Sequence, residues 1–155
     1  MAVFKYKLQN VLDIKLRMEE QAKATFAAAN SRLLEEEEKL DALKRRQSEY
    51  EEEGRRLREA VLNVMEMRDN TRAIEHLREQ LKEQQKAVDK ARENVEVARK
   101  RLTDAVQDRK IHEKLKEKSF EEFVHEVNAA ESKEIDELVS YTYGERIKKD
   151  EIKNG

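Results

Sequence analysis

A spacing of alternating three and four residues between apolar side chains runs along most of this chain and constrains its fold more than any other feature. The first run with this spacing has twelve positions, of which nine are apolar: Phe26, Ala29, Leu33, Glu36, Leu40, Leu43, Gln47, Tyr50, Gly54, Leu57, Val61 and Val64. The second run consists of Ile74, Leu77, Leu81, Gln84, Val88, Ala91, Val95, Ala98, Leu102 and Ala105. Because a sustained repeat of about 3.5 residues holds one face of a helix against a partner helix, both runs predict a coiled coil.

Composition favours long helices over a compact globule. Charged residues make up 44% of the chain and hydrophobic residues 37%, whereas a globular domain usually carries about 25% charged residues. With no proline and three glycines, little in the chain interrupts a helix. The chain cannot bury a thick core, so its few apolar residues must line up along one seam.

Charge and cysteine content exclude several classes of function. The 33 basic and 35 acidic residues nearly cancel, which gives no long-range attraction to nucleic acid or to an anionic membrane. The absence of cysteine removes disulfides, thiolate nucleophiles and cysteine-ligated metals. No apolar run resembles a signal peptide or is long enough to span a bilayer. We therefore expect a cytoplasmic protein that reaches a membrane only through a partner and binds no nucleic acid.

Asp69 and Asn70 lie between the two apolar runs and predict the turn of a hairpin. Asp and Asn favour turns by bonding their own backbone, and Asn can also cap a new helix. A short connection forces the two helices to be antiparallel neighbours. A turn at about 67–71 would place residue i opposite roughly residue 137 − i, so that Tyr50 would face Val88.

The predicted fold class is therefore all-α, a long antiparallel two-helix coiled-coil hairpin formed by residues 1–141. Its expected parts are helix 1 at about 3–66, the turn at about 67–71, helix 2 at about 72–139 and a charged flexible tail at 142–155. The alternative is a parallel coiled coil between two chains, but the break in the apolar pattern near the middle of the sequence argues against one uninterrupted helix.

No constellation of residues in the sequence predicts catalysis. Glu122 and His125 have the Glu-x-x-His spacing of di-iron helical bundles, but such a site requires a second pair, so a solvated histidine is the favoured interpretation. The three glycines lie far apart and form no phosphate-binding loop. A two-helix coiled coil also lacks an interior that could desolvate a reacting group. The chain is therefore predicted to be non-enzymatic, with no cofactor and no metal.

Both termini carry an excess of basic and aromatic residues, and the predicted hairpin brings them to one end. Residues 1–34 contain six basic and three acidic side chains, and residues 109–118 contain five basic and two acidic ones. Four aromatic residues are expected at the same end, namely Phe4, Tyr6, Tyr141 and Tyr143. Exposed aromatic side chains indicate a docking surface for another protein. The alternative interpretation is chance fluctuation in a charge-rich chain.

The N-terminus reads Phe4-Lys5-Tyr6-Lys7-Leu8-Gln9-Asn10-Val11-Leu12-Asp13-Ile14-Lys15, followed by Glu19-Glu20-Gln21-Ala22-Lys23 and an acidic run near residue 35. This pattern resembles the opening of the flagellar export protein J family (FliJ), especially its Gram-positive members, and the total length is similar as well. The resemblance implies a component of the flagellar type III export apparatus, located in the cytoplasm and peripheral to the cell membrane at the flagellar base. It implies an antiparallel coiled coil that binds the export ATPase hexamer and promotes its assembly. The cytoplasmic part of the export gate membrane protein and export chaperones are the further partners that it implies.

The resemblance also implies residues for two of these contacts. Those for the gate are Leu43, Tyr50 and Leu77, which belong to the apolar runs as well, while Arg46 and Gln84 stand where the family has a tyrosine and a histidine. The helix ends that carry the termini are implied to enter the ATPase ring, which gives as ATPase-binding residues Phe4, Tyr6, Lys7, Lys15, Arg17 and Tyr141. The predicted function is a non-enzymatic stalk that binds and promotes the export ATPase ring and links it to the gate. The alternative is a coiled-coil chaperone, escort or adaptor outside the flagellar system.

Overall fold

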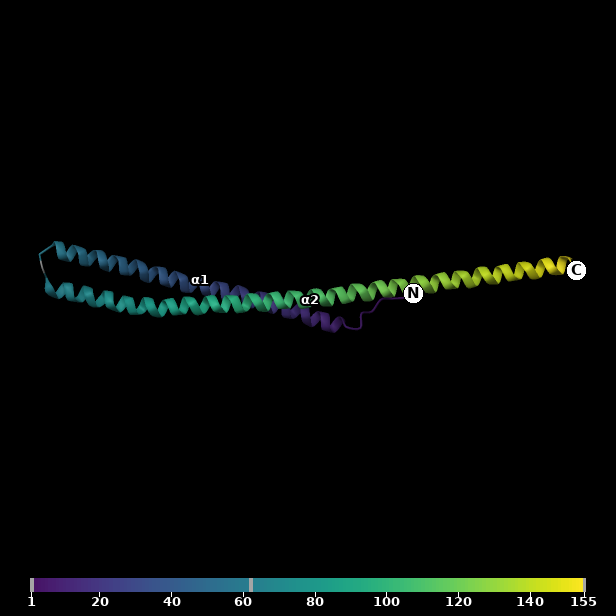
Figure 1. Cartoon of the computed structure of the whole chain (residues 1–155), viewed down its shortest axis with the longest axis horizontal. Coiled ribbons are helices and arrows are strands. Elements are labelled where there is room, and N and C mark those ends of the chain that lie inside the picture. Colours follow the sequence, from purple (N-terminus) through teal and green to yellow (C-terminus); the bar gives the residue numbers. More distant parts are fainter. Residues whose placement is uncertain (1, 62, 155) are drawn as a thin grey trace. The chain divides into compact units, whose positions relative to one another are not determined.

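The computed structural model describes residues 2–61 and 63–154 and consists of two long helices (Figure 1). Helix α1 spans Gln9–Glu59 and helix α2 spans Val64–Asn154. Over the described residues there is no strand, as expected for a sequence with almost no glycine or proline to interrupt a helix. The predicted fold class, an all-α hairpin of two long antiparallel helices, is confirmed.

The chain reverses direction between Glu59 and Val64, earlier than the sequence pattern predicts. Asn63 caps α2, because its side-chain oxygen accepts a hydrogen bond from the backbone N–H of Glu66 at 3.3 Å. The predicted turn at 67–71 is therefore wrong, since these residues form the beginning of α2. Apolar residues flank Asn63, so the sequence pattern does not indicate a turn there. Asp69 and Asn70 are residues that favour turns, but they lie within α2.

Both ends of the predicted hairpin also differ from the structure. Helix α1 begins at Gln9 rather than near residue 3, and its first turn is closed by the Gln9 N–H donating to the Tyr6 carbonyl at 3.2 Å. Residues 142–154, where a flexible tail was predicted, continue α2 as regular helix. Their Glu, Arg and Lys residues are good helix formers, and the single Gly144 costs only about 1 kcal/mol, which is too little to end the helix.

The chain forms two compact units. The hairpin unit, Arg17–Gln107, contains the connection between the helices. The terminal unit combines Met1–Leu16 with Asp108–Gly155. Neither helix is apolar enough over a sufficient length of its described residues to cross a membrane.

Most of the buried apolar side chains belong to the hairpin unit. They lie at heptad positions of both helices, in agreement with the seam that the sequence predicts: Leu40, Leu77, Val88, Ala91, Val95 and Ala98. Small alanines and valines of α2 fill the seam beside the larger side chains of α1, which lets the two helices approach closely. In the terminal unit the buried hydrophobic residue is Leu12.

The alignment of the two helices differs from the one predicted from a turn at 67–71. In the hairpin unit, Asn70 donates a hydrogen bond from its side-chain nitrogen to the Tyr50 carbonyl at 2.8 Å. Tyr50 therefore lies beside Asn70 and not beside Val88. Farther from the connection, the Arg99 guanidinium lies over the Phe26 ring, 5.9 Å from its centroid. Both contacts follow from the earlier reversal of the chain.

Candidate functional site

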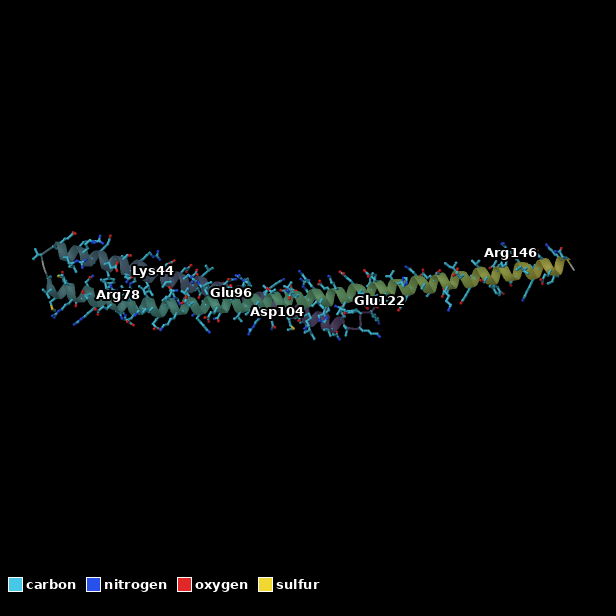
Figure 2. The ribbon with its side chains drawn as sticks, in the orientation of Figure 1. Lys44, Arg78, Glu96, Asp104, Glu122 and Arg146 are labelled. Atoms are coloured by element: carbon cyan, nitrogen blue, oxygen red, sulfur yellow. The ribbon has the colours of Figure 1, made fainter. Side chains whose placement is uncertain are left out.

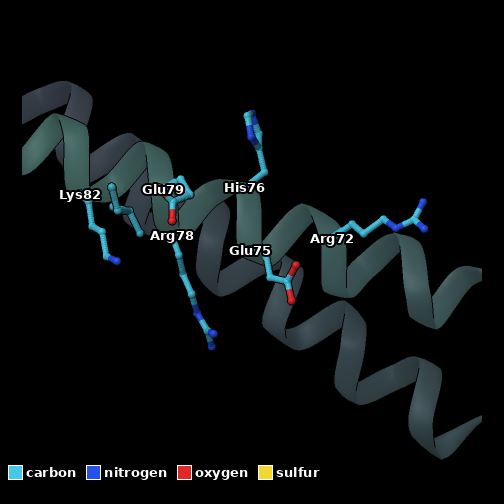
Figure 3. A pocket seen from close by; sticks show the side chains of 7 residues that line it. Arg72, Glu75, His76, Arg78, Glu79 and Lys82 are labelled. Atoms are coloured by element: carbon cyan, nitrogen blue, oxygen red, sulfur yellow. The ribbon is translucent and has the colours of Figure 1, made fainter.

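The hairpin unit carries an open groove on α2 (Figure 3). Its lining consists of Arg72, Glu75, His76, Arg78, Glu79, Leu81 and Lys82. All of these residues belong to one helix, and Figure 3 shows the His76 and Arg78 side chains pointing in opposite directions. Over the part of the chain that the structure describes, no group of acidic or histidine side chains could hold a metal ion.

The three residues implied for gate binding differ in how much surface they present. Leu77 is 3% exposed, so its side chain packs in the seam and is not accessible to a partner. Leu43 and Tyr50 are half-buried and stay partly accessible. Because Asn70 lies beside Tyr50, the same antiparallel register places Leu43 opposite Leu77. The structure thus brings the three residues into neighbouring layers of the hairpin unit.

Tyr50 borders a groove near the connection between the helices. The groove is lined by Tyr50, Glu53, Leu57, Glu66, Asp69, Asn70 and Ala73. Three of these residues are acidic and two are apolar, so the groove combines an aromatic ring with negative charge. Such a surface suits a partner segment that carries a basic or amphipathic side chain.

In the terminal unit, Phe4 packs against two aromatic residues of α2. Its ring centroid lies 5.2 Å from that of Phe120 in an edge-to-face arrangement and 5.5 Å from that of Phe123. Phe120 remains 49% exposed, so the cluster is open to solvent. A groove beside it is lined by Phe4, Gln9, Leu12, Leu16, Glu113, Lys116, Glu117 and Phe120. Sequence reasoning identified Phe4 but missed Phe120 and Phe123, because Phe4 lies in the non-helical segment before α1, which the heptad pattern does not align.

The other residues predicted to bind the ATPase fall into different surroundings. Lys15 forms an ion pair with Asp108 at 3.2 Å, and the Tyr6 hydroxyl is buried without a hydrogen-bond partner among the described residues. Lys7 and Arg17 are exposed, but Arg17 belongs to the hairpin unit. Tyr141 is 67% exposed. Phe4 and Lys15 contact α2 about 18 Å apart at 1.5 Å per residue, because Phe4 packs on Phe120 and Lys15 pairs with Asp108. The structure therefore does not gather the predicted residues into one site.

The predicted gathering of Tyr141 with Phe4 is wrong. Phe4 contacts Phe123, and Tyr141 lies about 27 Å farther along α2 at 1.5 Å per residue. The reason is that the chain reverses between Glu59 and Val64 and not at 67–71, so Phe4 meets an earlier part of α2.

The part of α2 beyond Val124 exposes a series of apolar side chains. The most exposed include Ile135 at 59%, Leu138 at 64% and Tyr141 at 67%. Figure 2 shows side chains projecting from both sides of this stretch, between the labelled Glu122 and Arg146. Monomeric proteins rarely expose so many apolar side chains along one element, so this stretch is a candidate for contact with another protein.

Comparison with known proteins identifies a family to which the chain is similar. A family model described as "Flagellar FliJ protein" matches residues 4–148, which includes parts of both units. No curated protein matches the chain. Among solved structures, the chain is similar to CT670 of Chlamydia trachomatis, described as a YscO homolog, with a TM-score of 0.58 and 24% sequence identity over 91% of this chain and 96% of that one. At this identity the likeness supports the helical hairpin fold.

Proposed function

Because this chain belongs to the FliJ family of flagellar proteins, and so to the components of flagellar protein export, we propose that it is a non-enzymatic stalk that binds and promotes the export ATPase ring and links it to the export gate. It acts in the cytoplasm at the base of the flagellum and reaches the membrane through its partners. Two features of the structure support separate parts of this proposal.

The distribution of exposed apolar side chains supports ATPase binding by the terminal unit, and this single observation carries the proposal. Most of the large hydrophobic residues that are exposed in the described part of the chain belong to this unit. The Phe4–Phe120–Phe123 cluster and the apolar stretch beyond Val124 both lie in it. Exposed apolar and aromatic residues mark surfaces that another protein covers.

Differential contact is the mechanism by which a bound helix pair promotes the ring. A stalk that contacts some subunits of a ring and not others stabilises one set of subunit conformations over the alternatives. Ring assembly and turnover then change although the stalk never contacts nucleotide. This mechanism requires a protein-docking surface and no catalytic group.

Electron microscopy of the export ATPase mixed with this chain and nucleotide tests the ring contact. We expect the chain to co-sediment with the ATPase and to add density at the centre of the ring. A chain shortened to residues 1–124 lacks the apolar stretch beyond Val124 and should lose most of this density. Rings that form without added density, or that bind the shortened chain equally well, would contradict the assignment.

The acidic groove beside Tyr50 supports gate binding by the hairpin unit. We expect Tyr50→Ala to weaken binding to the purified cytoplasmic part of the gate without changing helix content, because the hydrogen bond at this position uses the backbone carbonyl. The matched control is Leu77→Ala, which should lower the unfolding free energy by about 2–5 kcal/mol as expected for a buried leucine. If Tyr50→Ala bound the gate normally, or lost helix content as Leu77→Ala does, Tyr50 would be a seam residue only.

A further inference from the structure

Two side-chain amides of α2 donate hydrogen bonds across the seam of the hairpin unit to backbone carbonyls of α1. Asn70 Nδ2 donates to the Tyr50 carbonyl at 2.8 Å, and Gln84 Nε2 donates to the Glu36 carbonyl at 2.9 Å. Gln84 Nε2 also contacts the Glu36 carboxylate, with Oε2 2.6 Å away. All of these interactions are partly buried. We call the pairs Asn70–Tyr50 and Gln84–Glu36 the amide clamps.

The amide clamps repeat with the period of the apolar pattern. On α1, Glu36 and Tyr50 are two heptads apart, and on α2 the same separation divides Asn70 from Gln84. Each clamp has a side-chain amide on the second helix and a carbonyl on the first. Both clamps therefore specify the same antiparallel alignment of the two helices.

The apolar positions alone do not specify that alignment. In the observed register the heptad pattern places Leu40 beside Leu81. Sliding one helix by a heptad, about 10 Å, would give Leu40 either Ile74 or Val88 as its neighbour. All of these side chains are apolar, so the seam could form in any of the three registers.

Polar groups in the seam discriminate among the registers. Glu36 is 4% exposed, and its carboxylate also contacts Arg32 Nη2 at 2.9 Å on its own helix. After a slip of one heptad, Glu36 would face Leu77 or Ala91 and lose Gln84. A buried polar group that loses its partner is unfavourable, whereas apolar neighbours can be exchanged with little effect.

Gly54 adds a requirement of shape at the Asn70 clamp. A Cβ atom at Gly54 would lie 2.5 Å from Asn70 Oδ1, so the amide occupies the space that glycine leaves open. A slipped register would move Asn70 away from Gly54 and place a different side chain there. Charge, hydrogen bonding and shape therefore favour one alignment together.

We propose that Asn70 and Gln84 select the register of the hairpin unit from the alignments that the apolar heptads allow. The Leu43–Leu77 layer lies one heptad from each clamp, so the clamps also fix which side chains accompany Tyr50 at the surface. Only this consequence rests on the proposed gate binding. The selection of register is a property of the hairpin itself and is tested without any partner.

Because the natural chain contains no cysteine, pairs of introduced cysteines report the register directly. Leu40→Cys combined with Leu81→Cys reports the observed register. Leu40→Cys combined with Ile74→Cys or with Val88→Cys reports the two slipped registers. A disulfide forms only between cysteines whose Cα atoms approach within about 7 Å, so a slip of one heptad separates the outcomes. In the otherwise unchanged full-length chain, we expect oxidation to link only the first pair.

The deciding variant replaces both amides, as Asn70→Leu with Gln84→Leu. We expect at least about a tenfold gain in disulfides of the slipped pairs, because the apolar seam then accepts several registers. The matched control is Gln85→Leu with Asn94→Leu, since Gln85 bonds Asp89 on its own helix and Asn94 is exposed. The control should keep the parent pattern.

Disulfides confined to the Leu40–Leu81 pair after removal of both amides would overturn the proposal, as would equal slipping in the control. Circular dichroism of each variant verifies that helix content is preserved. If the double replacement loses helix content, the same disulfide pairs are measured in the single Gln84→Leu variant. The Asn70–Tyr50 clamp then remains to hold the helices together, and a gain in slipped disulfides is again expected.

Discussion

Gly54 is buried within α1, at a position where glycine costs about 1 kcal/mol relative to alanine in an unconstrained helix. The sequence alone suggests a weak point in the helix. In the structure, the Asn70 side chain fills the space above Gly54 and donates to the Tyr50 carbonyl. The glycine is therefore required by a close contact between the helices.

Gly54→Ala is expected to lower the melting temperature, although alanine is the better helix former. The new Cβ would lie 2.5 Å from Asn70 Oδ1, which forces the clamp to open. Thermal unfolding followed by circular dichroism measures the effect. The double variant Gly54→Ala with Asn70→Ala should recover part of the loss, because the clash is then absent.

Gly144 provides the matched control for Gly54. It also lies inside a helix, but a Cβ there would meet nothing within 4 Å. Gly144→Ala should therefore stabilise the chain by about 0.5–1 kcal/mol, as helix propensity predicts. Equal effects of alanine at both glycines would refute the role assigned to Asn70.

At the scale of the helices, the heptad pattern predicted the elements but misplaced the turn and the register. Long apolar periodicity without proline identifies helices and their buried faces, and Leu40, Leu77 and Val88 are buried as predicted. The turn was harder because Asn63 and Asn70 are equally suited to cap a helix or to bond a neighbouring backbone. Only the folded structure separates these roles.

The error in the predicted turn also affected the predicted residues of the candidate site. Phe4 was identified from its aromatic side chain, but its neighbours Phe120 and Phe123 were missed, because Phe4 lies in the non-helical segment before α1. Tyr141 was assigned to the same end because a turn at 67–71 would bring both termini together, whereas the chain reverses between Glu59 and Val64. Local composition identifies aromatic and basic residues that are candidates for a docking surface. It does not predict which of them contact each other in the fold.

The pairing of α1 with α2 is expected to depend on pH through Glu36. The hydrogen bond from Gln84, followed by the nearby Lys39 and Arg32 cations, lowers the pKa of the Glu36 carboxyl below its ordinary 4.5, against an opposing effect of burial. A lowered pKa in the folded state means that the ionised carboxylate stabilises the fold above pH 4.5. This stabilisation is lost as the pH falls through the lowered value.

Thermal melts of the parent chain and of Glu36→Gln between neutral and acid pH measure this contribution. The parent chain should lose more stability than Glu36→Gln as the pH falls below about 4.5, because the variant has no carboxylate to protonate there. Glu38→Gln, at an exposed position on the same helix, serves as the control and should follow the parent. Identical pH profiles for the parent and Glu36→Gln would show that the carboxylate does not stabilise the hairpin.

At the scale of the whole molecule, buried and exposed apolar side chains are distributed unequally between the two units. The hairpin unit contains most of the buried apolar side chains, together with the amide clamps that align its helices. The terminal unit contains most of the exposed large hydrophobic residues. We interpret the first unit as self-sufficient in packing and the second as a surface that a partner completes.

Stimulation of the export ATPase by paired surface variants tests this interpretation most directly. Leu138→Ser with Tyr141→Ser alters the terminal unit at positions 64% and 67% exposed, and Leu34→Ser with Val97→Ser alters the hairpin unit at positions 60% and 51% exposed. Neither pair disturbs a buried contact, so both variants should keep the helix content of the parent. We predict that the terminal pair reduces stimulation at least about fivefold while the hairpin pair leaves it unchanged. Undiminished stimulation by the terminal pair, or an equal loss in both, would contradict the account.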